Sequence, residues 1–138
     1  PMRPYHGVRL LLNDGQNNFE EKFFWPQNGA FGALPEDFDG DGDIDIIAIS
    51  YFPNYANTPS ECLVYLENQG DLKFEASTFP NNTSGRWLVL DKGDVDGDGD
   101  VDVVLGAFNE FQGQRPQKIQ KIWNNEGTSI MILKNTTN

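Results

Sequence analysis

Hydrophobic residues fall in short runs of four to eight positions along the whole chain, and polar segments separate these runs. The runs are rich in β-branched and aromatic side chains, and Gly, Asn, Asp or Pro bounds each of them, which is the signature of β-strands. No apolar period of about 3.6 residues persists over three helical turns. We therefore predict an all-β protein whose strands lie near residues 7–13, 19–25, 31–36, 44–51, 62–67, 73–79, 86–92, 101–108 and 129–134.

The pattern repeats along the chain. The segment 37–45 returns at 94–102, which is 57 positions later, and an apolar run follows each copy. The sequence pattern of residues 11–20 likewise recurs at residues 66–75. Residues 130–135 form a partial third copy, which corresponds to residues 66–68 and the apolar run that precedes them. Each repeat reads as strand, Asp-rich loop, strand, connection, strand, tight turn, strand. Four antiparallel strands per repeat are typical of a β-propeller blade.

The domain organisation follows from this repeat. We interpret residues 1–138 as one repeat region with a partial blade near 1–28, a complete blade near 29–82 and a partial blade near 83–138. Such a chain holds about two and a half blades, whereas propellers have at least four. We therefore expect a partial propeller, either a piece of a longer one or a homo-oligomer or other complex that closes the ring. The polar stretch 109–127 interrupts the last repeat, and we predict a surface loop there; of the three tryptophans, which we expect mainly in the core, Trp123 is the best candidate for exposure because it lies in this stretch.

The acidic residues gather in the two Asp-rich segments. The formal net charge is −11, and ten of the 21 acidic residues lie within residues 37–45 and 94–102. Carboxylates this close repel one another, and a hard divalent cation removes the repulsion. Ca²⁺ prefers carboxylate and carbonyl oxygens, while Zn²⁺ requires His or Cys, which both segments lack. The sequence predicts two calcium sites, formed by Asp37, Asp39, Asp41, Asp43 and Asp45 and by Asp94, Asp96, Asp98, Asp100 and Asp102.

A helix-flanked calcium hand is the obvious alternative for such a loop. That loop needs Gly at its sixth position, which Gly42 and Gly99 satisfy, and a bidentate Glu at its twelfth. The twelfth position is Ala48 in one segment and Leu105 in the other. Since the closing ligand is missing and the flanking runs are strands, we exclude the helical hand.

The two loops resemble those of FG-GAP/VCBS repeats, the blades of integrin-like β-propellers, in which Asp occupies the first, third, fifth and ninth positions. The resemblance covers nearly the whole chain. It implies that the seventh residue of each loop, Asp43 or Asp100, binds through its backbone carbonyl, so that its carboxylate is expendable. The same resemblance implies that the other four aspartates bind through side-chain oxygens, namely Asp37, Asp39, Asp41 and Asp45 in one loop and Asp94, Asp96, Asp98 and Asp102 in the other.

Several functional classes do not fit the sequence. Binding of nucleic acid needs clustered Lys and Arg, of which the chain has only 10 against 21 acidic residues. No apolar stretch approaches the length of a membrane span. Cys62 is the only cysteine and lies in an apolar run, so we expect a buried, inert thiol. His6 is the only histidine and has no nucleophile motif nearby, so we predict no catalytic residue and no enzyme activity.

We therefore expect a non-catalytic, calcium-binding propeller segment that is secreted, periplasmic or on the cell surface. Its partners are expected to be a protein or glycan ligand, or the neighbouring blades of a larger propeller; adhesion and scaffold roles are what the resemblance implies. Two alternatives stay open. The chain is the calcium-stabilised propeller portion of a larger secreted enzyme, such as a polysaccharide lyase or a redox-linked propeller, or it is a small subunit packed on a larger assembly.

Overall fold

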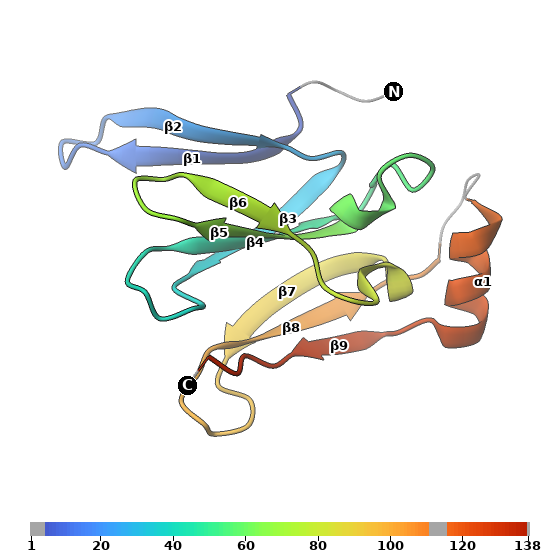
Figure 1. The fold of residues 1–138 in the computed structure, drawn as a ribbon. Coiled ribbons are helices and arrows are strands. Elements are labelled where there is room, and N and C mark those ends of the chain that lie inside the picture. Colours follow the sequence, from blue (N-terminus) through green and yellow to red (C-terminus); the bar gives the residue numbers. More distant parts are fainter. Residues whose placement is uncertain (1–4, 111–115, 138) are drawn as a thin grey trace.

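The protein is described by a computed structural model at residues 5–110 and 116–137, and its fold confirms the prediction of propeller blades. Within these residues nine strands form three antiparallel sheets that stack face to face (Figure 1). Sheet 1 consists of β1 (Gly7–Asn13) and β2 (Phe19–Pro26). Sheet 2 consists of β3 (Ala30–Glu36), β4 (Asp45–Ser50), β5 (Leu63–Asn68) and β6 (Phe74–Ser77). Sheet 3 consists of β7 (Trp87–Gly93), β8 (Asp102–Ala107) and β9 (Ile130–Leu133).

The strands within each sheet pair in the order in which they follow one another in the chain. Sheet 2 is therefore a complete four-stranded blade, while sheets 1 and 3 are partial blades of two and three strands. Every strand lies within two residues of its predicted bounds. Two short 3-10 helices, Pro59–Cys62 and Asn82–Ser84, lie in the connections that precede β5 and β7.

The hydrophobic core consists of two clusters, one between sheets 1 and 2 and one between sheets 2 and 3, and β4 contributes residues to both. All six residues of β4 are buried, because this strand is covered on both faces. Ile47 and Ile49 face sheet 3, and Ile46 faces sheet 1. Close packing requires Gly32, since a Cβ atom there would lie 2.8 Å from the Leu90 side chain of β7. The period of two along β4 thus joins three sheets into one stack.

The prediction of a surface loop over 109–127 is wrong, because part of it is the helix α1 (Gln117–Glu126). Ile119 and Trp123 are four residues apart, so they lie on one face of the helix, and both are buried. Trp123 is 8% exposed instead of accessible, its indole Nε1 donates a hydrogen bond to the Thr83 carbonyl (2.9 Å), and its ring meets that of Tyr55 edge-on. The helix is too short to show a sustained period in the sequence, and these two contacts with the body of the protein hold it in place.

Among the described residues, no helix is long and apolar enough to cross a membrane.

Candidate metal centres

Both Asp-rich segments form the loop between the first two strands of a sheet. One joins β3 to β4 and the other joins β7 to β8, and both lie at the end of the molecule that also carries the hairpin turns (left and lower left in Figure 1). The two loops have the same backbone turn, because Gly40 and Gly97 have φ of 77° and 84° and Gly42 and Gly99 both have φ of 97°. Residues with a Cβ atom rarely adopt such angles, so glycine at these positions lets each loop curl inward.

The first aspartate of each loop anchors this turn. The carboxylate of Asp37 accepts hydrogen bonds from the backbone N–H groups of Gly40 (2.9 Å) and Gly42 (3.0 Å). Asp94 repeats the pattern with the N–H groups of Gly97 (2.7 Å) and Gly99 (3.1 Å). Each carboxylate thus lies inside its loop, with backbone N–H dipoles directed at it.

Three carboxylates converge in each loop. In the first loop one oxygen of each of Asp37, Asp39 and Asp41 lies within 4.8 Å of the others, and the same holds for Asp94, Asp96 and Asp102 in the second. Asp43, Asp45, Asp98 and Asp100 lie outside these two groups. The donors are all oxygens, with no histidine or cysteine among them, which is the set that a hard divalent cation requires. Either group could hold a metal ion.

The last aspartate of each loop is buried and ties the loop to the third strand of its sheet. Asp45 is 0% exposed and accepts hydrogen bonds from the N–H groups of Phe38 (3.2 Å) and Asn68 (2.8 Å) and from the Tyr65 hydroxyl (2.7 Å). Asp102 is also 0% exposed and accepts from the N–H groups of Val95 (2.9 Å) and Asn135 (2.8 Å). Because each carboxylate oxygen has two lone pairs, these bonds leave capacity for a cation.

The electrostatic surroundings of the two loops differ. In the first loop burial, together with the neighbouring carboxylates, raises the pKa of Asp39. In the second, the Lys134 ammonium lies 2.5 Å from a carboxylate oxygen of Asp96, and this hydrogen bond lowers the pKa of Asp96 and raises the pKa of Lys134. Part of the negative charge of the second loop is therefore already compensated by the protein, whereas the first loop has no such cation within the described chain.

The sequence pattern did not identify the residues that support the loops. Tyr65 and Asn68 bind Asp45 from the neighbouring strand, and Lys134 and Asn135 do the same for the second loop. The Asn135 side chain also donates to the Phe38 carbonyl (2.6 Å), so the end of the chain touches both loops. One sequence signal could have identified Asn68 and Asn135. Each follows a similar apolar run, and this repetition marks the two residues as equivalent.

The remaining candidate side chains lie outside the two Asp-rich loops, either buried in the core or exposed on the surface. Cys62 is 0% exposed, and burial raises the pKa of its thiol to about 12, in agreement with an inert core residue. His6 is exposed near the start of the described chain. Of the basic residues in the polar stretch 109–127, Lys118 and Lys121 lie exposed on α1, and Arg115 falls outside the described residues.

Comparison with known proteins agrees with this geometry. A family model described as an FG-GAP-like repeat matches residues 37–105, which is half of the chain and includes both Asp-rich loops. No curated protein and no solved structure is a significant match. Together with the stacked four-stranded sheet, the family match shows that the chain belongs to the FG-GAP-like repeat family.

Proposed function

We propose that the chain is a calcium-stabilised β-propeller segment that acts as a non-catalytic scaffold or binding module outside the cytoplasm. The observation that carries the proposal is the pair of loops in which glycines 57 positions apart adopt the same positive φ and three carboxylates converge. Repulsion among these carboxylates opposes the closed loop. A bound divalent cation attracts all of them, so the net electrostatic energy of the closed loop becomes favourable. Because each loop joins two adjacent strands, the cation fixes the register of those strands.

Calcium is the metal that suits these ligands. The described groups supply three carboxylates each, and Ca²⁺ accepts six to eight oxygens in flexible geometry, so backbone carbonyls and water complete the shell. Mg²⁺ demands stricter octahedral geometry with fewer protein ligands. We assign one ion to each loop: four carboxylates and the Asp43 carbonyl in the first, and four carboxylates and the Asp100 carbonyl in the second. Exposed sites of this kind in extracellular modules bind with Kd of roughly 10⁻⁴–10⁻³ M.

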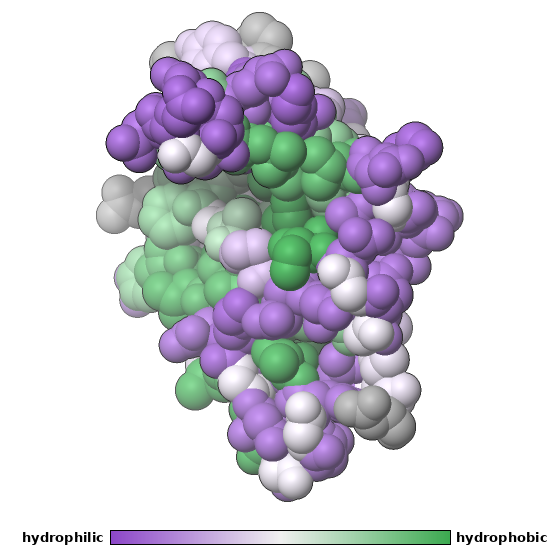
Figure 2. Space-filling view, turned by 90° about the vertical axis from the view of Figure 1, so that its left-hand side faces the viewer, coloured by the Kyte–Doolittle hydropathy of each residue, from purple (hydrophilic) through white to green (hydrophobic). Residues whose placement is uncertain are grey.

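The extracellular setting and the partners are part of the same proposal. FG-GAP-like repeats are generally non-catalytic and are typically found outside the cell, where free calcium is plentiful. Figure 2 looks onto the loop end of the molecule, where clusters of hydrophilic residues at the top, the bottom and one side surround hydrophobic ones. Such a surface suits contacts with a protein or a glycan. We assign the blades to residues 1–28, 29–82 and 83–138.

A neighbouring blade is the partner that the described surfaces support most directly. On the outer face of sheet 3, Val89 is 60% exposed, Ile130 is 67% exposed and Ile132 is 47% exposed. Single exposed apolar residues are common, but three of them on one sheet face, on the two strands that flank β8, form a patch of the kind that marks a protein contact. In sheet 2 the corresponding face is covered by sheet 3, and Leu63, the counterpart of Ile130, is 0% exposed.

The test combines calcium titration with thermal unfolding. Calorimetry should detect two bound calcium ions in the unaltered chain and one in Asp41→Ala or Asp98→Ala, and calcium should raise the melting temperature. Both variants should melt below the unaltered chain in calcium, and this difference should vanish in excess chelator. Asp43→Asn is the matched control, because it also removes one negative charge from the loop but leaves the backbone carbonyl in place. A melting temperature that ignores both calcium and chelator would contradict the proposal.

A further inference from the structure

One position of the repeat carries opposite charges beside the two Asp-rich loops. Asn68 and Asn135 each donate the backbone N–H group to the buried last aspartate of their loop, at 2.8 Å in both cases, so they occupy equivalent places. The residue before Asn68 is Glu67, in β5, and the residue before Asn135 is Lys134, directly after β9. A carboxylate in one repeat therefore corresponds to an ammonium group in the other.

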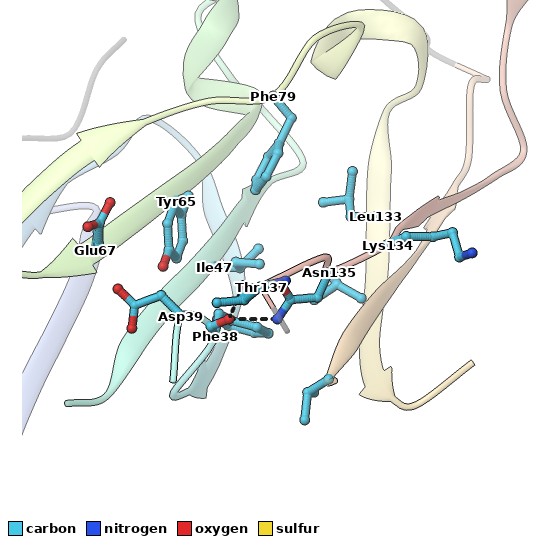
Figure 3. Close-up of a pocket in the computed structure, with 12 residues that line it drawn as sticks. Phe38, Asp39, Ile47, Tyr65, Glu67, Phe79, Leu133, Lys134, Asn135 and Thr137 are labelled. Carbon is cyan, nitrogen blue, oxygen red and sulfur yellow. Dashed lines mark hydrogen bonds between the residues drawn. The ribbon is translucent and has the colours of Figure 1, made fainter. Parts of the chain in front are cut away.

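Both of these side chains act on the third aspartate of their own loop. Glu67 and Asp39 line the same pocket between sheets 2 and 3, and their carboxylates lie on the same side of it in Figure 3. Burial raises the pKa of Asp39, and the negative charges of its neighbours, Glu67 among them, add to this increase. In the second loop the equivalent aspartate is Asp96, and the Lys134 ammonium lies 2.5 Å from its carboxylate. The repeat thus directs a negative charge at one loop and a positive charge at the other.

The charge of Lys134 acts on the second loop as a whole. The hydrogen bond to Asp96 and the charges of two further aspartates of this loop together raise the pKa of Lys134. A cation that binds Asp96 therefore competes with an ammonium group that the loop already attracts. Beside the first loop Lys92 forms an ion pair with Glu36, but the two charges of this pair cancel. The two loops consequently differ in net charge, although their aspartates are the same.

We propose that Glu67 and Lys134 give the two loops different calcium affinities, so that the first loop binds calcium at a lower concentration than the second. A unit charge at close range changes the affinity for a divalent cation about fivefold, because the ion carries two charges. The strands of sheet 2 are then fixed by calcium at concentrations at which those of sheet 3 are not. The inference rests on the proposed calcium function and states which of the two sites fills first.

Variants that retain one site measure each affinity by itself. Asp98→Ala leaves the first loop intact, and Asp41→Ala leaves the second loop intact. Calorimetric titration with calcium chloride then gives one dissociation constant for each loop. The dissociation constant of the first loop should be at least about fivefold smaller than that of the second, since the loops differ by a negative charge on one side and a positive charge on the other.

Removal of each charge tests its role in the matching single-site variant. Added to Asp41→Ala, Lys134→Gln should tighten calcium binding by the second loop about fivefold, and Lys134→Glu should tighten it further. Added to Asp98→Ala, Glu67→Gln should weaken calcium binding by the first loop about fivefold. Lys118→Gln is the matched control, because it removes the same charge from an exposed position on α1, at the opposite end of the molecule from the loops (Figure 1). It should leave both dissociation constants unchanged within about twofold.

Equal dissociation constants for the two single-site variants would overturn the inference. Unchanged affinity in Lys134→Gln or Glu67→Gln, or an equal change in the Lys118→Gln control, would do the same. A chain that binds no calcium at all would refute the proposed calcium function and the inference with it, whereas two sites of equal affinity would refute the inference alone. If an aspartate variant fails to fold, Lys134→Gln in the otherwise unaltered chain still decides the matter, because only the weaker of the two dissociation constants should then decrease.

Discussion

At the scale of single residues, the aspartates of each loop have different tasks. Asp37 and Asp94 organise the turn through glycine N–H groups, whereas Asp45 and Asp102 are buried and bind the neighbouring strand. Spacing alone predicted that the ten aspartates belong to two sites, because carboxylates that alternate within a tight loop repel one another unless a cation binds them. It could not separate their tasks, since the group that most distinguishes Asp45, the Tyr65 hydroxyl, lies 20 positions away in the sequence.

The burial of Asp45 leads to a prediction about the free energy of unfolding. Asp45→Asn keeps the shape of the side chain but replaces one acceptor oxygen with an NH₂ group, which cannot accept from the N–H groups of Phe38 or Asn68. An unsatisfied buried group costs about 1–3 kcal/mol, so the variant should lose about that much free energy of unfolding. The loss should appear both in calcium and in chelator, because these bonds do not involve the ion.

Urea denaturation in the two buffers measures this difference. Asp41→Ala is the comparison, since Asp41 is exposed and its cost should disappear in chelator. If Asp45→Asn is as stable as the unaltered chain once calcium is removed, the role of Asp45 as a strand tie is wrong and it acts as a ligand alone.

At the scale of elements, the strands were predictable and the helix was not. Short apolar runs rich in β-branched and aromatic residues, bounded by Gly, Asn, Asp or Pro, define the strands locally, so their bounds follow from a few neighbouring residues. The helix α1 depends instead on contacts with distant parts of the chain: Trp123 donates to the Thr83 carbonyl, and its ring lies against Tyr55. A ten-residue helix with two buried side chains has too weak a period to be recognised in a polar stretch.

The dependence of α1 on Trp123 can be measured directly. Trp123→Ala should cost about 3–5 kcal/mol of unfolding free energy, as for other buried large-to-small substitutions, and should reduce the helical circular dichroism signal. Trp123→Phe retains the ring but loses the hydrogen bond to Thr83, so it should cost about 0.5–1.5 kcal/mol and preserve the helical signal. Equal helical signals in all three proteins would mean that α1 does not need this anchor.

At the scale of the whole molecule, only sheet 2 has a described sheet on both of its faces. In sheet 2, Ile46 faces sheet 1 and Ile47 faces sheet 3, and both are buried. In sheet 3, their counterparts Val103 and Val104 differ, since Val103 is buried in the core and Val104 lies on the outer face. The sequence could not reveal this difference, because the apolar pattern of a strand is the same whether its second face is covered or open.

Two equivalent residues test whether the outer face of sheet 3 is built to be covered. Leu63 and Ile130 occupy the same position of the repeat, yet Leu63 is 0% exposed and Ile130 is 67% exposed. Leu63→Thr removes apolar volume and buries a hydroxyl, so it should cost about 2–4 kcal/mol of unfolding free energy in urea denaturation. Ile130→Thr should change the stability of the chain by no more than about 0.5 kcal/mol, because threonine keeps the β-branched shape and the site is exposed.

The decisive comparison is the same pair of variants in an assembly that places another sheet on this face. There Ile130 acquires the environment of Leu63, and the cost of Ile130→Thr should rise toward that of Leu63→Thr, measured as weaker association or a lower denaturation midpoint. A cost for Ile130→Thr that stays near zero in every assembled form would show that the outer face is a solvated surface. The exposed apolar side chains of sheet 3 would then need no partner.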